Sequence, residues 1–243
     1  MVGVTRTLLT TYLFQDLSPA EVDRMSAKAT VMRFERNQHI CRQGDAADEI
    51  WVLATGQLRE YRVDVDGNEF VSELMSPGAV FGEPGPFARE RDRVMNVVAV
   101  VPSEVIRIPR DDLYEFFLDH PPVLQRLLEG LASDARAALI DLPTAAYRSV
   151  FSRVLERLIL LASTHGVDAG DGAVRIDLRV SQSELAAMVG CTRENVNRVL
   201  STLADRGVVR LDRRSILVTD PRQLEFVAGS SEPVLHRRNR RVE

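Results

Sequence analysis

The feature that most limits how this chain can fold is a pair of short helical segments joined by a very tight turn. The run Ser181-Gln182-Ser183-Glu184 has the pattern of a capping box, which predicts a helix from Glu184 to Val189. Gly190 ends that helix, and Thr192 then caps a second helix from Arg193 to Asp205. Two helices with this connection predict a helix-turn-helix, whose second helix enters the major groove of DNA.

Two short apolar stretches follow the second helix. Val208 to Leu211 and Ser215 to Val218 flank Asp212-Arg213-Arg214, which is the pattern of a small hairpin. Such a hairpin can serve as a wing whose arginines contact DNA phosphates. The sequence therefore predicts a winged helix-turn-helix at this end of the chain.

The polar face of the second helix carries groups suited to reading bases. An arginine is a bidentate donor to guanine, and a glutamate accepts from cytosine. Polar residues at helix starts can hold phosphates. The candidate DNA contacts are Arg193, Glu194, Asn197 and Arg198 on the helix, with Ser181, Gln182 and Thr192 at the helix starts. The alternative is a solvated face with ordinary i,i+4 pairs such as Glu194 with Arg198.

Charge is distributed unevenly along the chain. The whole sequence has a net charge of −4 over 243 residues. From Ser181 to Glu243 we count 11 basic and 8 acidic residues, and the preceding part has 20 basic and 27 acidic residues. A basic C-terminal part joined to an acidic N-terminal part is typical of a DNA-binding module attached to a sensing module, although chance scatter gives the same counts.

The first half of the chain has the sequence pattern of a β-strand-rich domain. Between Val31 and Ile108, short runs rich in Val, Ile and aromatic residues alternate with turn residues, and Asp66-Gly67 is a strong hairpin signal. This spacing predicts a small barrel or sandwich. Ahead of it, Ser18 followed by Pro19 predicts the start of a helix.

A long helix separates the two halves. Apolar residues recur with 3-4 spacing at Leu124, Leu128, Leu131, Ala135, Ala138 and Leu142. This pattern predicts a helix that starts near Pro121-Pro122 and stops before Pro143, and it favours a seam between two copies of the chain. A helix packed on its own domain is the alternative, and a further helix is predicted from Tyr147 to Ser163 before a Gly- and Asp-rich loop.

The segment from Val180 to Leu200 resembles the DNA-binding helices of the Crp/Fnr (cyclic-AMP receptor protein / fumarate-nitrate regulator) superfamily of transcription regulators. The order of β-roll, long helix and winged helix is similar over roughly Leu8 to Val227. The resemblance implies an α+β fold with a cyclic-nucleotide-binding-type β-roll at 1–118, a dimerisation helix at 119–143 and a winged helix-turn-helix at 144–228. The basic segment at 229–243 lacks apolar periodicity, which predicts a disordered tail that either adds non-specific phosphate contacts or is simply solvated. It also implies a homodimer on a palindromic TGTGA-like operator read by Arg193, Glu194 and Arg198.

The segment Phe81 to Phe87, together with Arg93, resembles the family's phosphate-binding cassette, with Gly82, Glu83, Gly85 and Arg93 as the candidate effector contacts. Glycines free backbone amides for a phosphate, a glutamate accepts from a ribose hydroxyl, and an arginine forks onto the cyclic phosphate. The alternative is that the glycines serve the turn alone and the charged pair is structural.

The cassette departs from the pattern of cyclic-AMP binders. Val94 stands where those proteins have a small hydroxyl residue, and Ala138 and Leu139 stand where they present hydroxyls to the adenine. Pro84 and Pro86 remove two amide donors. We therefore expect weak affinity for cyclic AMP. One possibility is that another cyclic nucleotide or a cyclic dinucleotide is the effector. The alternative is that the protein has no effector and is a constitutive regulator with a vestigial pocket.

The remaining residues exclude other classes of function. Two cysteines, Cys41 and Cys191, are too few to hold an iron–sulfur cluster. His39 and Cys41, expected on one face of a strand, are weak candidates for haem ligands. The sequence has no metal-ligand spacing and no nucleophile–base motif that would indicate an enzyme. No leader or long apolar segment is present, so we expect a cytoplasmic protein without a membrane partner. Double-stranded DNA, a second copy of the chain and, for an activator, RNA polymerase are the expected partners.

Overall fold

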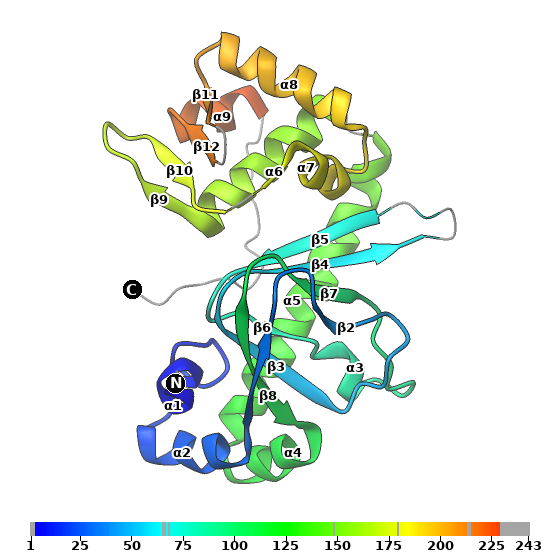
Figure 1. Cartoon of the computed structure of the whole chain (residues 1–243), viewed down its shortest axis with the longest axis vertical. Helices are drawn as coiled ribbons and strands as arrows, with labels where there is room; N and C mark the ends of the chain where they lie inside the picture. The colour runs from blue at the N-terminus through cyan, green and yellow to red at the C-terminus, as the bar shows by residue number, and fades with distance from the viewer. Residues whose placement is uncertain are drawn as a thin grey trace. The chain divides into compact units, whose positions relative to one another are not determined.

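The computed structural model describes residues 3–64, 67, 69–147, 149–178, 180–212 and 215–228 (Figure 1). Contacts divide the chain into two compact units. The first holds most of the residues up to Arg136, and the second holds the residues from Ala137 to His236 together with the short segment Asn68–Val71. The basic tail at 229–243 and the wing arginines Arg213 and Arg214 lie outside the described residues.

The first unit is a roll of two antiparallel sheets with the strand orders β1-β8-β3-β6 and β2-β7-β4-β5. The strands are β1 (Thr30–Phe34), β2 (His39–Cys41), β3 (Glu49–Thr55), β4 (Leu58–Val63), β5 (Glu69–Met75), β6 (Val80–Phe81), β7 (Asn96–Ala99) and β8 (Ser103–Pro109). The sequence-predicted strands are all present, and β4 and β5 are neighbours as the Asp66-Gly67 signal indicates, although Asp66 itself lies outside the described residues.

Strand β3 shows why the roll has two cores. Trp51 and Leu53 point to the space between the two sheets. The alternate residues Ile50 and Val52 point to the other face of their own sheet. That outer face is covered by α1 (Val4–Leu9), α2 (Pro19–Lys28), α4 (Arg110–Asp119) and the start of α5 (Pro121–Tyr147). Because both faces are buried, β3 reads as a continuous apolar run in the sequence.

The N-terminal helix signal is confirmed. The Ser18 side chain accepts from the Glu21 amide, the Glu21 carboxylate accepts from the Ser18 amide, and Pro19 is the first helical residue of α2. The short helix α1, which the sequence analysis did not predict, packs its buried Leu8 into the helix-covered core.

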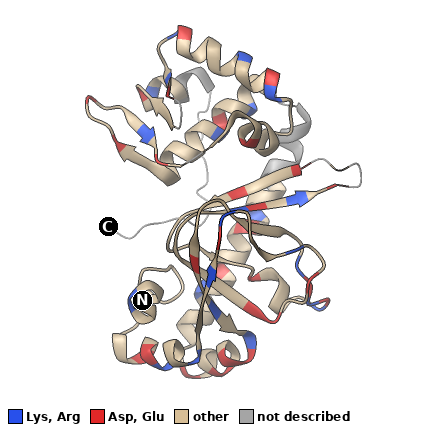
Figure 2. Ribbon diagram, in the orientation of Figure 1, with Lys and Arg blue, Asp and Glu red and all other residues tan. Residues whose placement is uncertain are grey.

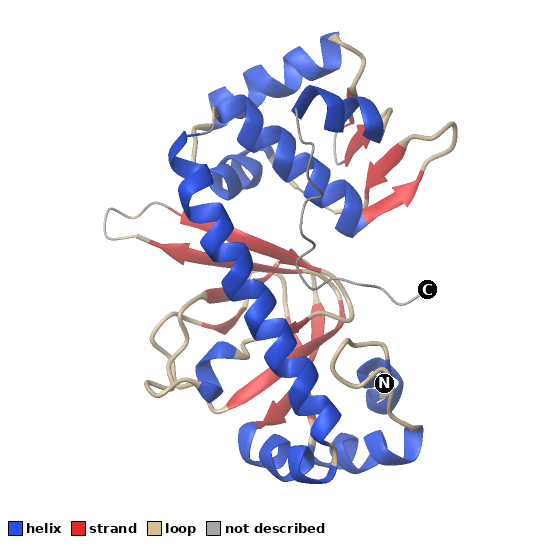
Figure 3. Ribbon diagram, turned by 180° about the vertical axis from the view of Figure 1, so that it is seen from behind, coloured by secondary structure: helices blue, strands red, loops and turns tan. Residues whose placement is uncertain are grey.

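Helix α5 is longer than predicted. It runs without interruption through Pro143 to Tyr147, 27 residues in all (Figure 3). The prediction that it stops before Pro143 is therefore wrong: the proline ring fixes a helix-compatible φ, and the loss of one amide donor does not end the helix here. Side chains from residue 140 to 147 lie outside the described residues, and Leu142 of the predicted seam is among them.

The described apolar residues of α5 divide into two kinds, and Leu131 is the described residue of the predicted seam that packs with the buried kind. Val123 and Leu127 are buried against the first unit, and Leu131 packs against the same core. By contrast, Leu124 and Leu128 are 37% and 57% exposed, and Ala135 and Ala138 are exposed as well. One face of α5 thus belongs to its own domain, and a separate apolar stripe faces outward.

The second unit is a helical domain with a small sheet. It contains α6 (Val150–His165), β9 (Gly166–Asp168), β10 (Val174–Ile176), α7 (Gln182–Val189), α8 (Arg193–Asp205), β11 (Val209–Asp212), β12 (Ser215–Val218) and α9 (Pro221–Ala228). The predicted wing hairpin is present as β11 and β12, inside a sheet of order β11-β12-β10-β9. Two predictions are wrong in detail: α6 starts after Tyr147, and the Gly- and Asp-rich loop contains strand β9.

Candidate nucleic-acid interface and nucleotide cassette

The helix-turn-helix is built by local hydrogen bonds that the sequence already indicates. The Ser181 hydroxyl accepts from the Glu184 amide at 3.1 Å, and the Glu184 carboxylate accepts from the Ser181 amide at 2.7 Å. Gly190 has φ 62° and ψ 53°, a left-handed conformation that a glycine adopts without strain. The Thr192 hydroxyl then accepts from the Asn195 amide at 3.3 Å and starts α8. The predicted caps and turn are confirmed.

Helix α8 has one buried side and one free side. Its buried side chains are Val196, Val199, Leu200 and Leu203. Its exposed side presents Arg193, Glu194, Asn197 and Arg198, which cluster at the N-terminal end of the helix, where Figure 2 shows acidic and basic residues together. The structure therefore brings the four predicted helix residues onto one accessible face.

The starts of α7 and α8 add to this face. Ser181 and Thr192 are exposed, and Gln182 is half-buried. The Gln182 amide donates to the Asn197 side chain at 3.4 Å, which links the start of α7 to the exposed face of α8. Hydrogen bonds from its own backbone amide and from the Thr192 side chain lower the pKa of Glu194. Glu194 is therefore an anionic acceptor at neutral pH, as a cytosine contact requires.

Two arginines of α6 brace the turn, and the sequence analysis missed them. Arg153 Nη1 donates to the Val189 carbonyl at 2.6 Å, and Arg157 Nη2 donates to the Met188 carbonyl at 3.3 Å. These carbonyls end α7 and have no partners within the helix, so cations are favourable there. The two arginines are four residues apart on α6, a spacing that places them on one face but does not identify what they contact.

The cassette glycines serve close packing. Gly82 has φ 80°, and a Cβ atom there would lie 2.7 Å from Arg93 Nη1. A Cβ atom on Gly85, in α3 (Pro84–Phe87), would lie 2.5 Å from the Ala47 Cβ. Gly82 therefore requires glycine for backbone shape and space, and Gly85 requires it for space.

The two charged cassette residues are buried and have protein partners. Arg93 is 4% exposed; its Nη1 donates to the Gly82 carbonyl at 2.9 Å, and its Nη2 donates to the Glu49 carboxylate at 2.8 Å. The guanidinium carbon lies 4.0 Å from the centre of the Trp51 ring. Glu83 is also 4% exposed and accepts from the Tyr12 hydroxyl at 3.1 Å. Glu49, Trp51 and Tyr12 were not among the predicted site residues.

A pocket of about 500 Å³ lies beside Arg93 and Val94. Of the four predicted effector contacts, Arg93 alone is among its lining residues, which include Arg62, Asp92 and Asn96. Val94 is 52% exposed, and Leu139 is 70% exposed. The pocket thus has polar residues beside Arg93, but the predicted contacts Gly82, Glu83 and Gly85 are not among its lining residues.

The two cysteines have different surroundings. Cys41 is buried in the core between the sheets, whereas the His39 ring nitrogen lies 2.9 Å from the Tyr61 hydroxyl. The strand pairing shifts between His39 and Cys41, so the expectation that they share one face is not met. Cys191 is half-buried in the turn between α7 and α8. Among the described residues, no group of three or more His, Cys, Asp or Glu side chains is placed to hold a metal ion.

We expect Cys41 to resist alkylation in the folded protein. Burial raises the pKa of its thiol to about 11 from an ordinary value of 9.0, so its thiolate fraction at pH 8 falls about 100-fold. Iodoacetamide labelling at pH 8, followed by mass spectrometry, will show Cys41 reacting much faster in urea than in buffer, with the half-buried Cys191 as the internal comparison. Equal rates for Cys41 in both conditions would contradict its placement in the core.

Comparison with known proteins relates these two units to characterised proteins. Residues 31–120 match the family profile of the cyclic nucleotide-binding domain, and residues 152–227 match that of the Crp-like helix-turn-helix domain. The cyclic AMP receptor protein of Thermus thermophilus is 31% identical over 216 residues, which cover 89% of this chain and 96% of that protein. The chain belongs to the Crp/Fnr family. The resemblance seen in the sequence is thereby confirmed, and the protein is a DNA-binding transcription regulator and not an enzyme.

A second relative and a solved structure show similar sequence and the same fold. The global nitrogen regulator of Synechocystis is 31% identical over 192 residues, covering 79% of this chain and 85% of that protein. The solved structure of FixK2 from Bradyrhizobium japonicum has a TM-score of 0.73 at 21% identity, covering 84% of this chain and 99% of that one, and shows the common fold. In the described residues, no helix is long and apolar enough to cross a membrane.

Proposed function

We propose that the protein regulates transcription as a homodimer on a palindromic operator of the TGTGA type. The observation that carries the proposal is the exposed face of α8, where Arg193, Glu194 and Arg198 stand over a fully buried apolar side. These residue types suit guanine and cytosine edges in the major groove, and Ser181, Gln182 and Thr192 suit the flanking phosphates. In such a dimer, the sensing role falls to 1–118, dimerisation to 119–143 and DNA reading to 144–228.

The outward stripe on α5 supports the dimer. Leu124 and Leu128 are large apolar side chains that stay exposed although the opposite side of the same helix is packed. A second copy of α5 covers such a stripe with a matching one, and it places two recognition helices about 34 Å apart, one turn of DNA. If the protein is an activator, it would also contact RNA polymerase. Because bacterial DNA lies in the cytoplasm, we expect the protein to act there.

The dimer is tested by the operator itself. We expect full affinity for a duplex with two TGTGA half-sites and a large loss when one half-site is scrambled, because half of the base contacts are removed. Fluorescence anisotropy at one stated salt concentration measures both affinities. A monomer by sedimentation that binds one and two half-sites equally well would contradict the proposal.

Two modes of control fit a protein of this family. In the first, a cyclic nucleotide or cyclic dinucleotide gates DNA binding by shifting the populations of two conformations. In the second, the protein binds its operator without an effector. The pairing of Arg93 with Glu49, and of Glu83 with Tyr12, favours the second mode because both candidate ligand contacts already have protein partners.

A further inference from the structure

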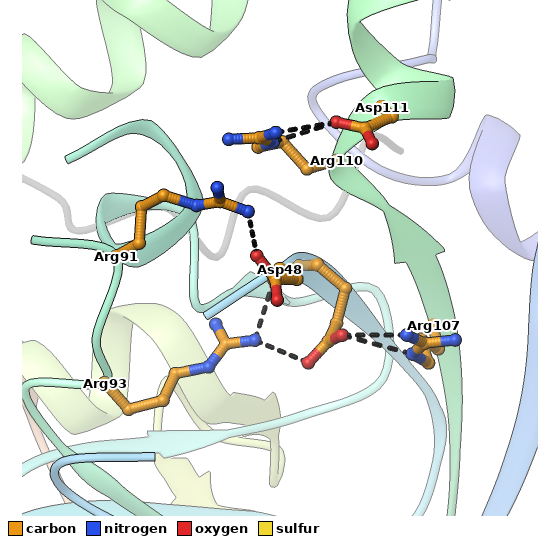
Figure 4. Close-up of polar contacts among 7 residues, drawn as sticks. Asp48, Arg91, Arg93, Arg107, Arg110 and Asp111 are labelled. Carbon is orange, nitrogen blue, oxygen red and sulfur yellow. Dashed lines mark hydrogen bonds and ion pairs between the residues drawn. The ribbon is translucent and has the colours of Figure 1, made fainter. Parts of the chain in front are cut away.

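Glu49 lies at the start of β3, at the edge of the core between the two sheets. It shares a strand face with Trp51 and Leu53, and its side chain is 14% exposed. Both of its carboxylate oxygens are used. Oε1 accepts from Arg93 Nη2 at 2.8 Å, and Oε2 accepts from Arg107 at 3.0 Å and 3.2 Å (Figure 4 draws Arg93 and Arg107 with the neighbouring Asp48 and Arg91).

Arg93 is held at the two terminal nitrogens of its guanidinium, whereas its Nε is buried and has no hydrogen-bond partner among the described residues. Its side chain is 3% exposed, its two terminal nitrogens donate to Gly82 and to Glu49, and its plane lies on Trp51. The Glu49 backbone carbonyl accepts from Nη2 as well, at 2.8 Å. A guanidinium that binds a cyclic phosphate would present these same terminal donors to the phosphate oxygens.

We propose that Glu49 is the resident anion of the cassette and takes the place of an anionic effector at Arg93. The inference rests on the proposed effector-independent mode and names the residue that produces it. A carboxylate and a phosphate use the same donors of an arginine, so one excludes the other. A cyclic nucleotide bound at Arg93 would also place its negative phosphate beside the negative Glu49 carboxylate, and two like charges in one site repel each other.

The consequence is that a change at Glu49 should create affinity for an anion. Glu49→Gln keeps the shape of the side chain and removes its charge, leaving Arg93 and Arg107 without their shared counter-ion. Asp48→Asn is the matched control: it makes the same chemical change at the neighbouring residue, whose carboxylate is paired with Arg91 instead. The probes are cyclic AMP and cyclic GMP, each titrated calorimetrically into the full-length chain.

We expect the wild type and Asp48→Asn to show no binding of either nucleotide at concentrations up to about 1 mM. Glu49→Gln should bind with a dissociation constant at least tenfold below that limit, at about 0.1 mM or less. The double variant Glu49→Gln/Arg93→Gln should lose that binding again. Two results would overturn the proposal: a dissociation constant of about 1 mM or below for either nucleotide and the wild type, or a folded Glu49→Gln that binds no better than Asp48→Asn.

A second measurement guards against a Glu49→Gln variant that fails to fold. The proposal expects the melting temperature of the wild type to be unchanged by about 1 mM cyclic AMP or cyclic GMP, whereas a ligand that binds the folded state raises it. A clear rise overturns the proposal without any variant. Operator binding by the nucleotide-free wild type is measured separately, so a failure of the DNA-binding proposal is distinguished from a failure at Glu49.

Discussion

Replacing Arg193 by alanine is expected to weaken operator binding by about 5- to 150-fold, corresponding to ~1–3 kcal/mol for a bidentate guanine contact. The loss should fall on the specific site, because Arg193 is exposed at the N-terminal end of α8 and touches no part of the core. Binding to a scrambled duplex should weaken far less. The ratio of the affinity for the operator to the affinity for the scrambled duplex should therefore fall.

Arg206→Ala is the matched control for this substitution. Arg206 is the exposed C-cap residue of the same helix, about 20 Å from Arg193 at 1.5 Å per residue, and its replacement removes the same charge. Anisotropy titrations with operator and scrambled duplexes measure both variants. If Arg193→Ala leaves the ratio of the two affinities unchanged, Arg193 does not read a base.

Leu203→Ala is expected to destabilise the DNA-binding domain by about 2–5 kcal/mol, because Leu203 is fully buried and its removal leaves a cavity beneath the reading face. For a domain of this size each kcal/mol lowers the melting temperature by about 4–8 °C, so a shift of roughly 8 °C or more should follow. Operator binding should be lost at a correspondingly lower temperature.

Leu211→Ala tests whether that loss comes from burial. Leu211 lies on β11 of the same domain and is 40% exposed, so the same chemical change there should shift the melting temperature by no more than a few degrees. Thermal melts of the full-length variants by circular dichroism make the comparison. Equal shifts in the two variants would mean that Leu203 does not lie in the core of the domain.

The exposed face of α8 and the turn before it could be predicted because their sequence signals are local. Ser181, Gly190 and Thr192 each act on backbone groups within a few residues, so their sequence pattern alone determines the caps and the turn. The four helix residues then follow from the helical period, since burial of Val196 and Leu200 fixes which side of α8 remains free.

The contacts that control the cassette could not be predicted in the same way. Glu49 and Arg93 are 44 residues apart in sequence, and Tyr12 and Glu83 are 71 apart. Only the folded roll brings these partners together, and nothing in the residues near Arg93 indicates which acid it meets. Arg153 and Val189 present the same difficulty, because their contact depends on how α6 packs against α7.

The proline in α5 shows a different limit of sequence reasoning. A proline inside an apolar helical pattern usually ends or kinks the helix, yet α5 continues past Pro143 to Tyr147. Strand β9 was missed for the opposite reason, since its three residues are surrounded by glycines and aspartates and carry almost no strand pattern.

The central claim, that α8 reads a specific sequence without help from a nucleotide, is tested most directly by one titration. A labelled TGTGA-N6-TCACA duplex and its scrambled counterpart are titrated with the protein at one stated salt concentration, alone and with cyclic AMP or cyclic GMP. We expect the operator to bind about a thousandfold more tightly than the scrambled duplex, with no change on adding either nucleotide. Equal affinity for the two duplexes, or operator binding that requires a nucleotide, would contradict it.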